Sequence, residues 1–338
     1  MVNFVDVYKY SDLIASILGL MINVTLMTAI FRTNRKGFHA YSYLLIVPCL
    51  NDFIFSSYQL LVQHLIKVDK GTIYIFPHGI ERLVPENTYW IFAFFHLFTI
   101  TNTFTTQPAI YHYRYVLITK VGQGGPTLKL LLRNICISVI GSSIVGVCFA
   151  ASIQQTFHRG KEFYIRELTP LWFNPDGSTG FLYASNWDDL ITKIYVASVV
   201  IVYSIANILA FYLIIISVKS VHVQTASVSE NTRHLRSQFT KTLISQTLVL
   251  TVLALIPCTI YMAALVFQLR GEYLGSIVLG PVSWFPCING LLPMYFVRAI
   301  RGFVLGLVGI HKGEPTSINI KSNNTSTVSS ASKVVEEI

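Results

Sequence analysis

The hydrophobic and polar positions divide the chain into seven long apolar stretches joined by more polar segments. Each stretch has the roughly 20 residues that a helix needs to cross a hydrocarbon core about 30 Å thick. The stretches are residues 10-32, 41-66, 88-118, 129-153, 190-218, 240-267 and 273-297. The pattern therefore predicts an all-α membrane protein, a seven-transmembrane helix bundle that forms one domain over residues 1–310.

The third stretch differs from the others in its polar positions. At helical spacing, His96, Thr99, Thr103, Gln107 and Arg114 fall on one face. A polar group in lipid is costly, so this face is expected to point into the bundle. With Arg114 at the cytosolic boundary, His96 lies about 27 Å along the helix, near its outer end.

Composition agrees with a membrane protein and excludes a soluble enzyme. Hydrophobic residues make up 53% of the chain and charged residues 12%, whereas a soluble domain has about 25% charged residues. The apolar stretches lack the regular alternation of a transmembrane β-barrel strand. The first stretch has no basic segment before it and no small-residue cleavage site, so we expect a retained helix rather than a signal peptide.

Charge predicts the orientation of the bundle. Of the 25 basic residues, 16 lie in the tail or in the connections after the first, third and fifth stretches, where they give a net charge of +12. The remaining segments carry −3. Because Lys and Arg are enriched on the cytosolic side, the N-terminus is expected outside and the C-terminus in the cytosol. The net charge of +9 then reflects orientation rather than nucleic-acid binding.

The C-terminal region is expected to have two parts. Residues 299-310 have the pattern of a short amphipathic eighth helix lying on the membrane. Residues 311-338 form a Ser/Thr-rich segment that is expected to be a disordered cytosolic tail, either simply solvated or a substrate for phosphorylation. Two glycosylation sequons, at Asn323 and Asn324, lie in this tail. Their modification would contradict the predicted orientation.

Three polar residues in different stretches are candidates for an internal polar network. These are Asn23, Asp52 and Asn289. Two interpretations remain open: a site for sodium or water, or buried hydrogen bonds that fix the packing of the helices.

Several of these residues, taken in order, resemble a G-protein-coupled receptor over residues 10 to about 310. The shared features are Asn23, Asp52, the Tyr113-Arg114-Tyr115 sequence, Pro257 and the Pro293-Met294-Tyr295 sequence. The details look more like nematode serpentine chemoreceptors of the Str and Srd type than like the rhodopsin class. Those details are the sequences YHYRY at 111–115, KTLISQTL at 241–248 and YFVR at 295–298.

The chain also departs from the rhodopsin-class pattern. Tyr113 stands where an acid normally precedes the arginine, so the usual local salt bridge is missing. Leu292 precedes Pro293 in place of asparagine, and no cysteine begins the third stretch. Any lock of the inactive state would therefore be built differently.

The resemblance implies a chemosensory, olfactory-type receptor in the plasma membrane, for which a sensory cilium is the expected site. It would bind a small odorant or other chemical ligand, activate a heterotrimeric G protein, and meet a kinase and arrestin at the tail. The residues expected to serve G-protein coupling and the switch are Arg114, Tyr115, Arg233, Arg236, Lys241, Pro293 and Tyr295. For most of the basic ones, anchoring at the cytosolic membrane surface is an equal alternative.

The ligand pocket is expected among aromatic residues in the outer halves of the stretches. The candidates are Trp90, Phe94, His96, Tyr195, Val199, Tyr203, Tyr261 and Trp284. Such a pocket suits a small, weakly polar molecule. Two alternatives stay open: Trp90 and Tyr195 could belong to an interfacial aromatic belt, and His96 could complete a buried hydrogen-bond network.

Other functional classes fit the sequence less well. The histidines are scattered without the spacing of metal ligands, and Asp52 is the one clearly intramembrane carboxylate, so no enzyme, metal or cofactor is expected. A multi-pass transporter is the main alternative, although no inverted repeat is evident. A ligand-gated channel of the insect odorant type would place the N-terminus inside, against the charge pattern.

Overall fold

The computed structural model describes residues 4–33, 39–119, 128–157, 160–166, 168–169, 172–173, 182–223, 230–307 and 309. The chain divides into a large unit, Met1–Val304, and a small one, Leu305–Ile338. The large unit holds the helical bundle. The whole expected 311-338 tail, with its two sequons, lies outside the described residues.

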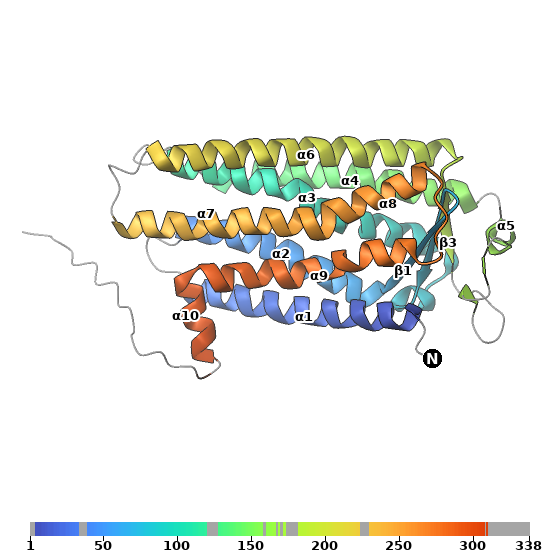
Figure 1. The fold of residues 1–338 in the computed structure, drawn as a ribbon, viewed down its shortest axis with the longest axis horizontal. Helices are drawn as coiled ribbons and strands as arrows, with labels where there is room; N and C mark the ends of the chain where they lie inside the picture. Colours follow the sequence, from blue (N-terminus) through green and yellow to red (C-terminus); the bar gives the residue numbers. More distant parts are fainter. Residues whose placement is uncertain are drawn as a thin grey trace, which may run out of the picture. The chain divides into compact units, whose positions relative to one another are not determined.

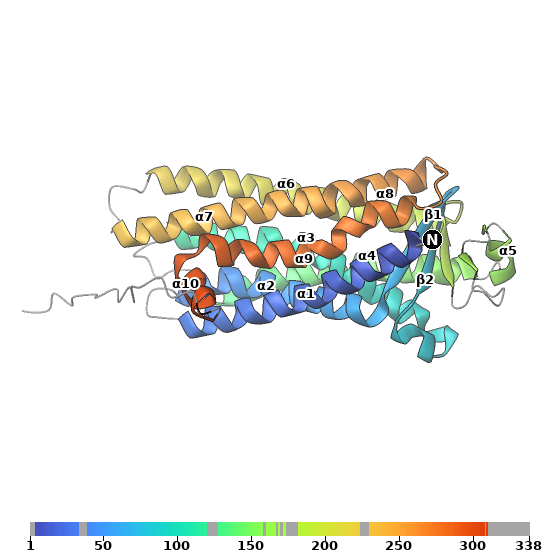
Figure 2. The same cartoon turned by 60° about the horizontal axis from the view of Figure 1, so that its bottom comes forward.

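In the described part of the large unit, seven long helical rods run side by side (Figures 1 and 2). They are α1 (Phe4–Thr33), α2 (His39–Val62), α3 (Tyr89–Thr119), α4 (Leu128–Phe157), α6 (Leu190–Val223), the pair α7 (Glu230–Leu250) and α8 (Ile256–Val266), and α9 (Leu274–Phe296). A short helix α5 (Lys161–Ile165) follows α4, and α10 (Arg298–Leu307) follows α9. The helix α10 covers most of the expected 299-310 segment.

Six of the seven rods are long and apolar enough to cross a membrane. The exception is α3, which has 31 residues but carries a dense series of threonines, Asn102 and Gln107 that lowers its hydropathy. Large apolar side chains remain exposed along α4 and α6, for example Ile140, Ile144, Ile201 and Ile205. Lipid would cover such faces, because water would make them unfavourable.

A three-stranded antiparallel sheet lies at the end of the bundle where α1 begins, here called the sheet end (Figure 1). It consists of β1 (His64–Asp69), β2 (Thr72–Pro77) and β3 (Tyr183–Asn186), in the order β1-β2-β3. The prediction of a helix over 41-66 is therefore wrong at its end: α2 stops at Val62, and His64 to Ile66 belong to β1.

The turn between β1 and β2 explains why the chain forms a hairpin here. Asp69 pairs with Thr72, which leaves Lys70 and Gly71 as a two-residue loop. Both loop residues have positive φ, 48° and 75°, as a turn that matches the twist of a hairpin requires. The β-branched Ile66 and Val68 before the turn, and the alternating β-branched and aromatic residues 72–76 after it, favour strands.

The sheet is packed against the ends of α8 and α9 and covered by the segment that follows α4. The ring of Phe76 stacks on Trp172 at 4.7 Å between centroids. On the other side, Ser276 of α9 donates a hydrogen bond of 2.9 Å to the carbonyl of Ile66. A Cβ on Gly275 would lie 2.6 Å from that same carbonyl oxygen, so only glycine permits this approach.

The rod formed by α7 and α8 is interrupted by one turn of π-helix, η5 (Thr251–Leu255). The N–H of Ile256 bonds to the carbonyl of Thr251, five residues back. Pro257 has no N–H to continue the regular ladder, and a wider turn accommodates the missing bond. Figure 1 shows α8 inclined to α7 at this point. The rod starts at Glu230, ten residues before the predicted 240-267 stretch.

Candidate functional site

Four of the expected ligand residues come together in the bundle below the sheet. Tyr195, Val199, Tyr203 and Tyr261 are all buried and belong to one hydrophobic core cluster, to which α3, α4 and α9 also contribute. We call these four residues the aromatic core. Tyr203 also reaches α3, where its hydroxyl lies 3.4 Å from that of Thr101. The aromatic core therefore connects the sheet-end halves of α6 and α8 to α3.

Three other expected ligand residues lie elsewhere. The side chain of Trp90 is 45% exposed, as in an interfacial aromatic belt. Phe94 packs against α4, where a Cβ on Gly146 would come within 2.8 Å of its ring. Trp284 donates a hydrogen bond of 3.1 Å to the hydroxyl of Ser11 and so faces α1. The structure does not bring these three side chains into the aromatic core.

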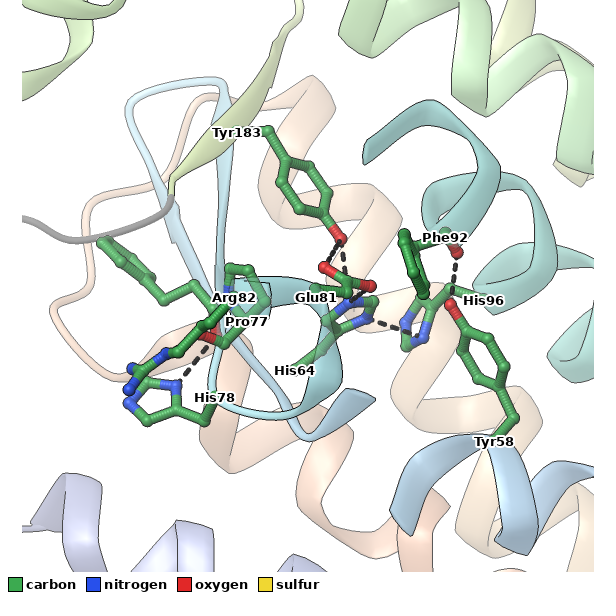
Figure 3. Close-up of polar contacts among 10 residues, drawn as sticks. Tyr58, His64, Pro77, His78, Glu81, Arg82, Phe92, His96 and Tyr183 are labelled. Carbon is green, nitrogen blue, oxygen red and sulfur yellow. Dashed lines mark hydrogen bonds and ion pairs between the residues drawn. The ribbon is translucent and has the colours of Figure 1, made fainter. Parts of the chain in front are cut away.

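His96, the remaining candidate, belongs to a buried polar cluster with His64, Glu81 and Tyr183 (Figure 3). The two Nδ1 atoms of His96 and His64 are 3.1 Å apart. His64 Nε2 lies 2.7 Å from a Glu81 oxygen. The Tyr183 hydroxyl lies 2.8 Å from the same nitrogen and donates to the other Glu81 oxygen at 3.2 Å. We call these four residues the histidine cluster.

The sequence did not predict His64, Glu81 or Tyr183 as site residues. They lie in β1, in the short 3-10 helix η1 (Ile80–Leu83) and in β3 respectively, and meet only because β1 and β3 both pair with β2. The signal that could have found them is the hairpin turn after Asp69, since it brings His64 opposite Pro77 and close to Glu81.

The environment of Tyr183 keeps its hydroxyl protonated. Burial raises the pKa of Tyr183 well above its usual value, and the charge of Glu81 adds to this. Tyr58 of α2 stands on the bundle side of the cluster, with its ring 6.2 Å from that of His96 and its hydroxyl donating to the carbonyl of Phe92. Tyr183 therefore acts as a donor to Glu81.

A small cavity of about 10 Å³ lies beside the histidine cluster. Its lining residues are Tyr8, Lys9, Asp12, Gln63, His64, Leu65 and His78. A volume of this size is about what one water molecule needs. Burial lowers the pKa of His78 to about 4, although its bond to the Phe76 carbonyl acts in the opposite direction.

A second charged group ties the sheet to the connection between α8 and α9. Lys67 of β1 is fully buried, with its ammonium nitrogen 3.5 Å from a Glu272 oxygen and 3.7 Å from an Asp69 oxygen. Glu272 also accepts hydrogen bonds from Thr169 and Trp172. Burial alone would raise the pKa of Glu272, but these bonds and the charge of Lys67 lower it below its usual value.

At the other end of α3, Arg114 is buried against α7. Its guanidinium donates to the hydroxyl of Thr240, which itself donates to the Arg236 carbonyl at 2.7 Å. One turn closer to the sheet, the hydroxyl of Tyr111 bonds to that of Thr247. The contact between α3 and α7 is therefore built from an arginine and neutral hydroxyl groups.

The other expected switch residues are more dispersed. Arg236 is 4% exposed, whereas Arg233 and Lys241 are exposed, so these three do not share one surface face. Tyr115 is half-buried and Pro293 is buried within α9. The side chain of Tyr295 is 66% exposed. The structure thus places Arg114 at the contact of α3 with α7, Arg236 buried one turn before Thr240 in α7, and Tyr295 on the outside of α9.

The three residues of the expected polar network join α1, α2 and α9. Asn289 donates a hydrogen bond to Asp52. Asn23 donates to the Pro286 carbonyl at 3.3 Å and to the Gly19 carbonyl at 2.9 Å. They include hydrogen bonds between helices, as the helix-packing interpretation requires. The buried Oδ1 atoms of Asn23 and Asn289 have no hydrogen-bond partner in the described structure, so a site for sodium or water also stays a prediction. Among the described residues, no group of three or more His, Cys, Asp or Glu side chains has an arrangement that could hold a metal ion.

Comparison with known proteins identifies the family. No curated protein matches the chain. A family model described as the serpentine type 7TM GPCR chemoreceptor Str matches residues 8–305, which is most of the chain. This is a family of receptors rather than of enzymes, and its match agrees with the membrane-spanning helices of the structure. The chain is a multi-pass membrane protein that belongs to the Str family of seven-transmembrane G-protein-coupled chemoreceptors.

Proposed function

We propose that this chemoreceptor binds a small, weakly polar molecule from outside the cell and activates a heterotrimeric G protein in the cytosol. In this proposal all seven rods cross the membrane, α3 included, and α10 lies on its inner surface. The receptor works in the plasma membrane, and the family suggests a sensory cilium.

Charge supports this orientation. Arg114, Arg233, Arg298 and Arg301 lie at the ends of helices opposite the sheet. Basic residues near helix ends favour the cytosol. In the proposed orientation the sheet end, where α1 begins, therefore faces outside. The ligand would then approach from the sheet, and the G protein from the end where α3 meets α7.

The aromatic core is the proposed ligand site. Tyr195, Tyr203 and Tyr261 offer apolar ring faces and few ionisable groups, which suits a small molecule with one or two polar atoms. The core is closely packed in this structure. A ligand would therefore have to displace these rings, and their movement would reach α3 through Thr101 and Phe104, which touch Tyr203.

The observation that carries the proposal is the series of contacts along α3. In the half of α3 nearer the sheet, Thr101 contacts Tyr203. Thirteen residues later in the same helix, Arg114 donates to Thr240. The π-helical turn η5 and Pro257 divide α8, which bears Tyr261, from α7, which bears Thr240. Movement of α8 at this hinge would open the α3–α7 contact, which gives the two linked states that a receptor needs.

The experiment that tests this proposal compares Arg114→Ala with Arg133→Ala. Arg133 is a matched control because it is an exposed arginine in α4 at the end of the bundle opposite the sheet, where Arg114 also lies. Cells expressing each receptor at equal surface levels would be exposed to volatile and water-soluble compounds, and G-protein activation recorded. We expect Arg114→Ala to abolish the response to any compound that activates the unchanged receptor, and Arg133→Ala to retain it.

Full signalling by Arg114→Ala at normal surface levels would refute the role of this arginine. A ligand-dependent ion current that persists without any G protein would instead favour the channel alternative. A kinase and arrestin acting on the tail remain part of the proposal, and residues 311-338 lie outside the described structure.

A further inference from the structure

With Glu81 as a carboxylate, the hydrogen bonds of the histidine cluster determine which ring nitrogens carry protons. Glu81 is fully buried and accepts from Tyr183 through one oxygen. Its other oxygen faces His64 Nε2, which must carry a proton to donate to it. His64 Nδ1 is then unprotonated and accepts from His96 Nδ1. The donors thus point from His96 to His64 to Glu81.

We propose that this cluster is a proton-binding site, and that protons at the sheet end are a second ligand of the receptor. Taking up one proton makes His64 a donor at both nitrogens, so the His96 Nδ1 that faces it must become an acceptor. The proton of His96 then resides on Nε2, on the other side of its ring. The charge of the cluster changes from −1 to 0, which relieves the cost of burying an unpaired carboxylate.

The surroundings of His64 favour proton exchange with the sheet end. Its ring lines the cavity that has room for about one water molecule, and Tyr8, Lys9 and Asp12 of α1 line it too. Asp12 accepts a hydrogen bond of 2.5 Å from Ser283 of α9. Asp12 and Lys9 are therefore the two ionisable side chains of α1 that line the cavity.

The remaining titratable neighbours do not compete for the proton near neutral pH. Tyr58 of α2 lies beside His96 and donates its hydroxyl to the Phe92 carbonyl. His78 also lines the cavity, but its pKa of about 4 keeps it neutral there. The neighbouring Arg82 donates to the Pro77 carbonyl at 2.8 Å.

The site could influence the receptor because His96 belongs to α3. Five residues further along the same helix, Thr101 bonds to Tyr203 of the aromatic core. A proton that changes the bonding of His96 therefore acts on the helix that also carries Arg114. Two points rest on the proposed function: that the site faces outside the cell, and that its proton influences signalling through α3. Proton binding itself does not depend on that function.

The test uses the whole receptor in lipid nanodiscs, labelled with nitrogen-15 in its histidine side chains, and the proton as the probe. The variants His64→Gln and His96→Gln identify the signals of the two rings. From about pH 8 to about pH 5, the range in which imidazole ordinarily exchanges protons, we expect both signals to shift together with one midpoint and the uptake of one proton. No shift, or two independent shifts, would overturn the proposal.

Two further variants keep the test decisive if a glutamine variant fails to fold. Tyr183→Phe removes the hydroxyl that stabilises the Glu81 carboxylate, so the midpoint should move up by about one pH unit. His78→Gln alters another ring that lines the same cavity and should leave the midpoint unchanged. A downward or absent shift in Tyr183→Phe would contradict the assigned donor role. Because NMR involves no G protein, failure of signalling and failure of the proton site are separate results.

Discussion

Arg114 is nearly fully buried, and its guanidinium donates to the Thr240 hydroxyl. None of the ion pairs formed by the described residues includes it. A buried guanidinium with a neutral partner is held less firmly than one in a buried salt bridge. The same segment has Tyr113 where an acid would otherwise provide a local partner. In the proposed mechanism, this contact is broken when a partner protein offers the guanidinium better acceptors.

Glu272 gives a test at the same scale. Its side chain accepts from Thr169 and Trp172 and lies 3.5 Å from the buried ammonium of Lys67. Glu272→Gln retains an acceptor but removes the charge, so we expect the receptor to be destabilised by about 1 kcal/mol, with a lower thermal midpoint in detergent. Asp188→Asn, which removes an exposed carboxylate at the same end, is the matched control and should change little.

The pH dependence of this contact has a definite sign. Because the folded-state pKa of Glu272 is lowered, its stabilising effect is complete above the ordinary glutamate value and is lost as pH falls through the lowered value. Fluorescence of Trp172 should therefore change below about pH 4.3 and not between about pH 5 and about pH 8. A change in the upper range that persists in His64→Gln would contradict this assignment.

The sequence could predict the burial of polar residues that lie on one face of a single helix. The burial of His96 and Arg114 was predicted because a polar face on a membrane helix is expected to point into the bundle. Glu81 and Tyr183 are 102 positions apart and meet His64 only through strand pairing, so helical periodicity gives no indication of them. Trp90, Phe94 and Trp284 lie apart from the aromatic core because an aromatic side chain on a membrane helix can equally face lipid or a neighbouring helix.

At the scale of elements, the hairpin is the main difference from the sequence prediction. The apolar run continues from α2 into β1, so hydropathy alone extends the helix to Ile66. The structure instead turns the chain after Val62, where Gln63 has a φ of 46°. The signal for a hairpin was the pair Lys70-Gly71, which separates the β-rich segments 64–69 and 72–77.

The hairpin turn can be tested at Gly71. Its φ of 75° is costly for a β-branched residue, by about 1–2 kcal/mol. We expect Gly71→Val to lower the thermal midpoint and to weaken the histidine cluster, because the turn sets the register of β1. Gly71→Asn is the matched control, since asparagine tolerates this conformation in hairpin turns. Equal midpoints for the two variants would show that the turn does not limit the stability of the sheet.

At the scale of the whole molecule, the helical bundle was largely predictable because lipid demands long apolar segments with internally bonded backbones. Six rods are both long and apolar enough to meet that demand. The helix α3 is long enough but less apolar, because it carries many of the polar side chains of the interior. What the sequence could not predict is how the rods touch, for instance that Arg114 would meet Thr240 across 126 positions. Such contacts depend on packing rather than on local pattern.

In the proposed mechanism, opening the α3–α7 contact activates a G protein. The most direct measurement is ligand-free nucleotide exchange by a purified heterotrimeric G protein with receptors in nanodiscs, comparing the unchanged chain with Thr240→Val and Thr242→Val. Thr242 is the matched control, because its hydroxyl bonds only within α7, to the Gln238 carbonyl. Loss of a charged hydrogen bond is worth about 1.5 kcal/mol or more, so Thr240→Val should raise exchange about ten-fold and Thr242→Val should not. Equal exchange by all three receptors would contradict this mechanism.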